Sequence, residues 1–352
     1  MKIMTVKGQI SPDELGLTLP HEHLLLDSSI WCRESSEISR KKLADKMVDI
    51  TNIGLLRIDP YLLKDNTILE DIDLAIEELM YFKRMGGRSL VEMSNIGLGR
   101  DVLGMRAISE ETGMHVVAGC GYYIEGAIPI EYRNLTDDQL ANRVVSEIRD
   151  GIGDTGIRPG IIGEIGTTPD LTAFDVKMLR VAAKVQVETG LTISVHNEFS
   201  RAHHKILDVL EKEGVDLHRV VLCHLDQLTS VMTDIQYQQS LLERGVYLEY
   251  DGFGTCTLVY TYPLWQIGAL WDDQFPRDVD KVKTLVKLVE KGFLDQLLIS
   301  HDTSTKSALK KYGGVGYDHI LCSVIPFCKR YGMTDEQVQT ILVGNPTRML
   351  SY

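Results

Sequence analysis

Eight short apolar runs, separated by longer amphipathic stretches, are the feature that most constrains the fold of this chain. Strands that are apolar at nearly every position are typical of parallel sheets with both faces covered by helices. Eight such strands, each followed by a helix, predict an α/β fold of the (β/α)8 TIM-barrel class, formed by residues 1–352 as a single domain. The runs lie at residues 17–24, 88–93, 115–121, 159–166, 191–196, 219–224, 245–250 and 295–300.

The segments between these runs carry recognisable helix starts and loop signals. A threonine followed three residues later by a glutamine predicts helices that begin after Thr136 and Thr334, and the second is expected to end before the NPTRML sequence at 345–350. Residues 2–10 are expected to form a small N-terminal strand cap outside the barrel. The polar stretch 28–66 fits an elaborated loop between the first two strands.

The charge and composition exclude several classes of partner. With 50 acidic and 37 basic residues the net charge is −13, so the average surface repels phosphate backbones and anionic membranes. The N-terminus lacks the apolar region of a signal peptide, and no window supplies about 18 consecutive apolar residues. The cysteines form no CxxC pair. The sequence therefore predicts a cytoplasmic protein that acts on a small molecule, without nucleic acid or membrane partners.

Residue types that bind metals recur at the carboxyl ends of the predicted strands, where barrel enzymes place their active sites. In a strand, residues i and i+2 point to the same side, so His21 and His23 face the barrel interior together while Glu22 faces the surrounding helices. Six ligands exceed the set of one tetrahedral zinc, so two divalent ions that share a carboxylate are expected: zinc, with manganese, cobalt or nickel as alternatives. The predicted metal ligands are His21, His23, Glu164, His196, His224 and Asp302.

These strand-end motifs, taken in order, are similar to those of a known family. HEH at 21–23, GIIGEIGTT at 160–168, SVH at 194–196, LCH at 222–224 and SHD at 300–302 resemble the phosphotriesterase family of the amidohydrolase superfamily. The motifs GRD, GCGYY, NPTRML and KKYGGVGYDHIL extend the resemblance over the whole chain, which looks most like the phosphotriesterase homology proteins.

The resemblance also implies a role for each ligand. It implies that His21, His23 and Asp302 hold the more buried ion, and that His196 and His224 hold the more exposed one. Glu164 would bridge the two ions, at the place where many members of the family carry a carbamylated lysine.

The expected reaction is metal-dependent hydrolysis of an ester-like bond, in which a metal-bridging hydroxide attacks and the catalytic residue Asp302 takes up its proton. The expected substrate is a lactone, in particular a sugar lactone with or without a phosphate group. The alternative is hydrolysis of a phosphoric ester or phosphotriester, and a remote alternative is a catalytically silent metal-binding barrel. His301 should point away from Asp302 and is given no catalytic role. A Schiff-base aldolase is disfavoured because no predicted strand end carries a lysine.

Polar side chains near the strand ends are predicted to contact the substrate. The tyrosines offer hydroxyl groups to a polyol, and the cations suit a phosphate or carboxylate, with a solvated surface position as the alternative for each cation. The aromatic stretch 252–278 either forms a lid over the pocket or packs on itself or on a second subunit, so the sequence leaves a homodimer open. The predicted contacts are Tyr122, Tyr123, Arg100, Arg201 and Lys281.

Overall fold

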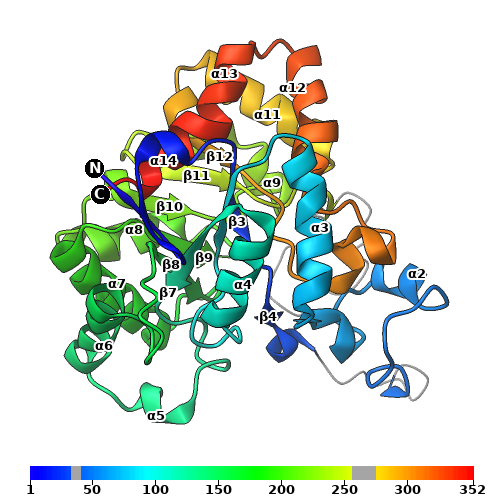
Figure 1. The fold of residues 1–352 in the computed structure, drawn as a ribbon. Helices are drawn as coiled ribbons and strands as arrows, with labels where there is room; N and C mark the ends of the chain where they lie inside the picture. The colour runs from blue at the N-terminus through cyan, green and yellow to red at the C-terminus, as the bar shows by residue number, and fades with distance from the viewer. Residues whose placement is uncertain (33–40, 198, 256–274) are drawn as a thin grey trace.

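A barrel of eight parallel strands forms the centre of the computed structural model, which describes residues 1–32, 41–197, 199–255 and 275–352 (Figure 1). Each predicted apolar run overlaps one of these strands, so the predicted fold is confirmed. The sheet follows chain order, and every hydrogen-bonded pair in it is parallel. The strands are β3 (Thr18–Glu22), β6 (Ser89–Glu92), β7 (His115–Cys120), β8 (Ile161–Thr167), β9 (Ile193–Asn197), β10 (Val220–Leu222), β11 (Tyr247–Tyr250) and β12 (Leu297–Ile299).

Helices connect the strands and cover the outside of the barrel (Figure 1). Their apolar faces pack against the outward side chains of the strands in one large buried core. The helix after Thr136 begins with both reciprocal bonds of the predicted capping box. The outer helices are α3 (Ile72–Arg84), α4 (Val102–Thr112), α6 (Asp137–Asp150), α7 (Ala173–Thr189), α8 (His203–Lys212), α10 (Ile235–Leu242), α11 (Asp278–Glu290) and α12 (Ile325–Arg330), with short turns at α5 (Ile130–Arg133) and α9 (Thr229–Met232).

The C-terminal helix runs further than the sequence predicts. It begins after Thr334 as α13 (Asp335–Gln339), continues through a π-helical turn at Thr340–Gly344 and ends as α14 (Asn345–Leu350). The expected end before the NPTRML sequence is therefore wrong. A wide π-helical turn precedes Pro346 and accommodates this residue, which has no N–H to donate to the preceding turn.

Apolar side chains close the amino ends of the strands. A hairpin of β1 (Ile3–Thr5) and β2 (Gly8–Ile10) forms the predicted strand cap outside the barrel. Ile3 belongs to a buried cluster with inward-facing strand residues such as Val117 and Leu298. Because this cluster fills the amino end of the barrel, the polar site is left to the carboxyl ends of the strands.

Between β3 and β6 the chain forms an elaborated loop, as predicted for the polar stretch 28–66. Its described part holds the short helix α2 (Ile53–Leu56) and a 3-10 turn at Lys64–Thr67. The loop is joined at its base by β4 (Leu26–Asp27), which pairs antiparallel with β5 (Ile68–Leu69).

A buried carboxylate joins the two ends of the hydrogen-bonded sheet, which are β3 and β12. Glu22 Oε1 accepts hydrogen bonds from Ser300 Oγ at 2.8 Å and from His301 N at 3.0 Å. Its Oε2 accepts from Thr303 N at 3.1 Å. Glu22 points away from the barrel interior, as expected, but it closes the seam between the first and last strands and does not simply face the helices.

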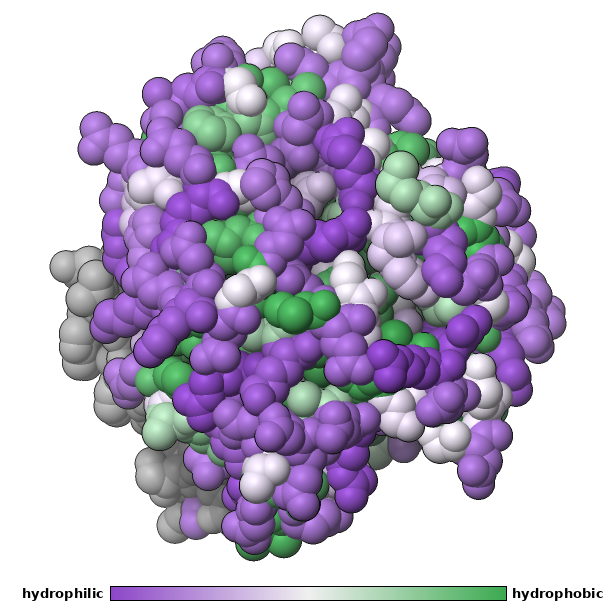
Figure 2. Space-filling model, turned by 90° about the vertical axis from the view of Figure 1, so that its left-hand side faces the viewer, coloured by the Kyte–Doolittle hydropathy of each residue, from purple (hydrophilic) through white to green (hydrophobic). Residues whose placement is uncertain are grey.

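The surface on the side of α7 and α8 is mostly hydrophilic, with small and scattered apolar patches (Figure 2). Within the described part of the chain, no helix combines the length and the apolar character needed to cross a membrane.

Candidate metal centre

The six predicted ligands converge at the carboxyl end of the barrel. Five of them come from the end of a strand or from the residues that follow it, and Glu164 lies within β8, three residues before its end, so the parallel barrel itself brings them together. They come from five strands that are distant in sequence: β3 supplies His21 and is followed by His23, β8 and β9 supply Glu164 and His196, β10 is followed by His224, and β12 is followed by Asp302.

Glu164 lies at the centre of the cluster, and its two oxygens face different histidines. Oε2 is 2.9 Å from His196 Nδ1 and 3.6 Å from His224 Nε2. Oε1 is 3.5 Å from His23 Nε2, and His21 Nε2 is 3.7 Å from Oε2. One carboxylate therefore stands between two pairs of imidazoles.

Asp302 lies beside the pair of imidazoles formed by His21 and His23. Its Oδ1 is 3.3 Å from His23 Nε2 and 3.8 Å from His21 Nε2. Its backbone N–H donates to the His21 carbonyl at 3.3 Å, which ties the residue to β3. The Asp302 side chain is 18% exposed, whereas the other five are at most 4% exposed. Asp302 is therefore the predicted ligand that a substrate can reach.

The cluster fits divalent metal ions. Among the described residues, His21 Nε2 is buried and has no hydrogen-bond partner, and such an unpaired buried nitrogen costs about 1–3 kcal/mol unless something binds it. Ligand atoms around a tetrahedral zinc stand about 3.3 Å apart. The distances between cluster atoms, from 2.9 to 3.8 Å, bracket this value. Two groups of residues that could hold an ion share Glu164: one with His21 and His23, the other with His196 and His224.

Two buried carboxylates that sequence analysis missed orient the histidines of the cluster. Glu249 Oε2 is 3.0 Å from His21 Nδ1, and Asp251 Oδ1 is 2.9 Å from His224 Nδ1. Because Nδ1 of each ring is held from outside, its Nε2 points into the cluster. A signal for both carboxylates is present in the sequence: Glu249 and Asp251 are two residues apart at the end of the seventh strand, which is the spacing of His21 and His23.

Hydroxyl groups hold the other two histidines. Ser94 Oγ is 2.9 Å from His23 Nδ1. His196 is turned the other way, with Nδ1 toward the central carboxylate and Nε2 at 3.1 Å from the Tyr123 hydroxyl. Trp31 Nε1 donates to the same hydroxyl at 3.2 Å. The structure therefore places Tyr123, a predicted substrate contact, against a predicted metal ligand.

The carboxylates of the cluster favour the protonated forms of His21 and His23. Burial lowers the pKa of His21, but the hydrogen bond to Glu249 and the nearby carboxylates outweigh it and raise that pKa to about 9. Burial opposes protonation of His23 as well, but Asp302 and Glu164 raise its pKa to about 10. Burial raises the pKa of Glu164, but the imidazoles, led by His196, hold it well below its usual range. An ion that binds at neutral pH must therefore displace protons.

Two predicted ligands have a left-handed backbone. His224 has φ of 62° and Asp302 has φ of 51°, values that side-chain-bearing residues rarely adopt. Such conformations cost about 1–3 kcal/mol each and are found where the surroundings hold them. Here Asp251 Oδ2 accepts a hydrogen bond from His224 N at 3.0 Å, and Asp302 N donates to the His21 carbonyl.

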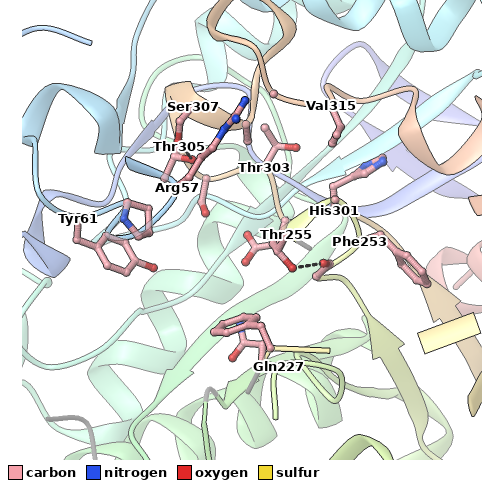
Figure 3. A pocket seen from close by; sticks show the side chains of 18 of the residues that line it. Arg57, Tyr61, Gln227, Phe253, Thr255, His301, Thr303, Thr305, Ser307 and Val315 are labelled. Atoms are coloured by element: carbon pink, nitrogen blue, oxygen red, sulfur yellow. Dashed lines mark hydrogen bonds between the residues drawn. The ribbon is translucent and has the colours of Figure 1, made fainter. Parts of the chain in front are cut away.

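A pocket opens beside Asp302 (Figure 3). Its walls come from the loop between β3 and β6, from the segments that follow β9, β10 and β11, and from the loop after β12. His301 also reaches the pocket wall, but its Nδ1 lies 2.6 Å from Glu22, so it turns away from the cluster as predicted. The polar residues along the walls are Arg57, Tyr61, Gln227, Thr255, His301, Asp302, Thr303, Ser304, Thr305 and Ser307.

The remaining predicted substrate contacts do not line this pocket, and other groups engage each of them. Arg100 forms a two-pronged ion pair with Glu147 of α6, and Arg201 pairs with Asp234. Tyr122 donates to the Leu140 carbonyl at 3.2 Å. Lys281 is fully buried, 3.0 Å from Asp226 Oδ2, and also donates to the Gly252 carbonyl. The structure does not bring these four side chains to the described pocket walls, and a role in substrate binding stays a prediction. Most of the proposed lid, residues 256–274, lies outside the described residues.

Known proteins resemble this chain over its whole length. The model of the phosphotriesterase family matches residues 1–350. An N-acetyltaurine hydrolase from Danio rerio is 35% identical over 100% of this chain and 98% of its own. A resiniferatoxin-binding protein from Rhodobacter sphaeroides has a TM-score of 0.93 and 39% identity, covering 99% of this chain and 94% of that one. A phosphotriesterase homology protein from Escherichia coli, complexed with phosphate in its active site, has a TM-score of 0.76 and 27% identity, covering 96% and 100% of the two chains.

Sequence, fold and site agree on one family. The matches extend over the barrel and not over a fragment of it. The strand-end residues that suggested the resemblance form one buried cluster that could hold metal ions. The chain belongs to the phosphotriesterase family and is a hydrolase of that family.

Proposed function

We propose that this hydrolase cleaves the carbonyl–nitrogen bond of a small N-acylated amine at a binuclear metal centre. The observation that carries the proposal is the position of Glu164, shared between two groups of potential ligands and close to the accessible carboxylate of Asp302. The substrate class is supported by relatives named N-acetyltaurine hydrolase that are 35% identical over the whole chain.

Two divalent ions in this cluster would lower the pKa of a water molecule and polarise the carbonyl oxygen of the substrate. His21, His23 and Asp302 would hold one ion, His196 and His224 the other, and Glu164 would contribute to both. Zinc suits a set of four imidazoles, and manganese, cobalt and nickel accept the same ligand types.

Asp302 would carry the proton during the reaction. Burial raises its pKa, but the hydrogen bond to His23 and the neighbouring imidazoles lower it below its usual value. Asp302 is therefore ionised at neutral pH and can accept a proton from water as the water oxygen bonds to the acyl carbon. When the carbon–nitrogen bond breaks, the same proton passes to the leaving nitrogen, and the products are a carboxylic acid and an amine.

A lactone is the second candidate substrate. Its ring opens by the same attack on a carbonyl carbon, and the pocket wall offers hydroxyl groups from Thr303, Ser304, Thr305 and Ser307 to a hydroxylated ring. We consider a phosphotriester a poorer candidate substrate than an amide or a lactone. The hydroxyl groups of the pocket wall and Arg57 would find no hydrogen-bond partner on its apolar substituents.

The test is a comparison of substrates on one metal-loaded preparation. The purified protein is reconstituted with zinc or manganese, its metal content is measured, and kcat/KM is determined on N-acetyltaurine, on sugar lactones and on paraoxon. We expect about two ions per chain and the highest kcat/KM on the amide. A content that never exceeds one ion would refute the binuclear centre. Faster opening of a lactone would select the second candidate, and a preference for paraoxon would refute both.

A further inference from the structure

We propose that Arg57 binds the acidic group of the substrate, so that the enzyme selects N-acyl amines that carry a sulfonate or carboxylate at the other end. This inference rests on the proposed hydrolysis of an N-acyl amine and adds to it the charge of the substrate and the residue that recognises it.

The backbone at Arg57 is held by a small helical core. Arg57 caps the carboxyl end of α2, where its N–H donates to the Ile53 carbonyl at 3.3 Å. The preceding residue, Leu56, is fully buried in a cluster with Leu62 and Leu63. The arginine side chain therefore extends from a fixed point of the loop and not from a free tip.

The loop that carries Arg57 is also joined to the loop that follows Asp302. Lys306 Nζ lies 2.5 Å from Asp65 Oδ1 in a largely buried ion pair. Asn66 Oδ1 accepts from Ser307 N at 2.8 Å, and Asn66 Nδ2 donates to Ser307 Oγ at 3.1 Å. These bonds join the two loops into one wall of the pocket, so little order has to be gained when a ligand binds.

Arg57 gives this wall its positive charge. Among the described lining residues, Arg57 is the only basic side chain of the lysine and arginine type. The only carboxylate among them is that of Asp302, a predicted metal ligand. Within the described part of the chain, no ion pair or hydrogen bond engages the guanidinium. The three cations predicted from the sequence differ in this respect, because Arg100, Arg201 and Lys281 each pair with a carboxylate.

The surroundings of Arg57 suit an oxyanion. Figure 3 draws Arg57 on the same side of the pocket as Thr305 and Ser307, with Gln227 across from it. A guanidinium offers parallel N–H donors that match the geometry of a carboxylate, and sulfonate presents oxygens in a similar way. Asp302 lines the same pocket, so an acid bound at Arg57 and an acyl group at the cluster would belong to one bound molecule.

The experiment compares three amides that differ only at the end remote from the acyl group. N-Acetyltaurine carries a sulfonate, N-acetyl-β-alanine a carboxylate, and N-acetylethanolamine a neutral hydroxyl. Charged hydrogen bonds of this kind are worth about a ten- to hundredfold change in kcat/KM. We expect Arg57→Gln to lower kcat/KM by that factor for both acids and to leave the neutral amide unchanged. Arg57→Lys should fall between, because it keeps the charge and loses the paired donors.

Arg149→Gln is the matched control and should leave kcat/KM on all three amides unchanged, since Arg149 is 61% exposed, pairs with Glu188 and does not line the pocket. An equal loss on all three amides, or no loss on the acids, in Arg57→Gln would overturn the inference. Hydrolysis of none of the three by the wild type would instead refute the proposed function. In that event, calorimetric binding of N-acetyltaurine to the zinc-loaded protein decides the role of Arg57: binding that Arg57→Gln weakens supports it, and binding that is absent or unchanged overturns it.

Discussion

Asp251 should determine how tightly the second pair of histidines holds an ion. Its carboxylate accepts two hydrogen bonds from one residue, from His224 Nδ1 at 2.9 Å and from His224 N at 3.0 Å. In Asp251→Asn one oxygen becomes an NH2 group, which accepts nothing and would face one of these two donors. The imidazole then either loses its orientation or moves its proton to Nε2, the atom that faces the cluster.

The size of the effect follows from these two bonds. Loss of an outer partner of a metal-binding histidine lowers metal affinity about 10- to 100-fold, which corresponds to about 1.4–2.7 kcal/mol. The remaining oxygen of Asp251→Asn can still accept from His224 N and support its left-handed backbone at φ of 62°. Asp251→Ala removes that support as well, at a conformation that costs about 1–3 kcal/mol to hold. The alanine variant should therefore bind metal more weakly than the asparagine variant.

The assay is a zinc titration in competition with a chromophoric chelator. We expect one of two ions to bind about 10- to 100-fold more weakly in Asp251→Asn and the other to be little changed. Asp208→Asn is the control, because Asp208 is 68% exposed and only forms a surface ion pair with Arg244. If Asp251→Asn bound both ions within about twofold of the wild type, far less than the loss of an outer partner should cause, the reasoning would be refuted.

Three further predictions concern the cluster itself. Asp302→Asn should keep much of its metal, because an amide oxygen can still coordinate, but should lose about 10²–10⁴-fold in turnover as measured on the best substrate; near-normal turnover would remove Asp302 from proton transfer. Many members of the family carry a carbamylated lysine where this chain has Glu164, and a carbamylated lysine needs carbon dioxide to form. Added bicarbonate should therefore not increase the activity recovered on reconstitution. A clear requirement for bicarbonate would contradict the proposed bridging role of Glu164. Because the pKa values of His21 and His23 are raised to about 9 and about 10, metal binding should release protons at neutral pH and tighten as the pH rises toward those values. Calorimetry in two buffers of different ionisation enthalpy measures the proton release. An equal heat of binding in both buffers would falsify the prediction.

The convergence of the six predicted ligands could be anticipated from the sequence because they lie at or near the carboxyl ends of apolar strands, and a parallel barrel gathers these ends at one face. The two-residue spacing of His21 and His23 was enough to predict that both side chains face the barrel interior. Glu249 and Asp251 have the same spacing, but carboxylates at a strand end are also common as solvated residues. Their role became visible only through the Nδ1 atoms that they hold.

The substrate contacts were harder to predict, because a sequence does not show which charges pair. Arg100 meets Glu147, which lies 47 residues later on another element, and this pair leaves the arginine guanidinium engaged outside the pocket. Lys281 likewise forms an ion pair with Asp226. Arg57 follows no strand and lies within a polar loop, so no periodicity distinguishes it. Its position in the pocket depends on the packing of two loops that are about two-thirds of the chain apart.

The Glu22 seam has a consequence for how the protein is made. Glu22 joins Ser300 across 278 residues, so a chain leaving the ribosome cannot close the barrel until nearly all of it has been synthesised. Such distant contacts form late and slowly. His21 and His23 emerge at the beginning of synthesis, whereas Asp302 emerges near its end. Closure of the barrel therefore coincides with completion of the predicted ligand set, and a nascent chain that meets a metal ion early can offer it only some of these six residues.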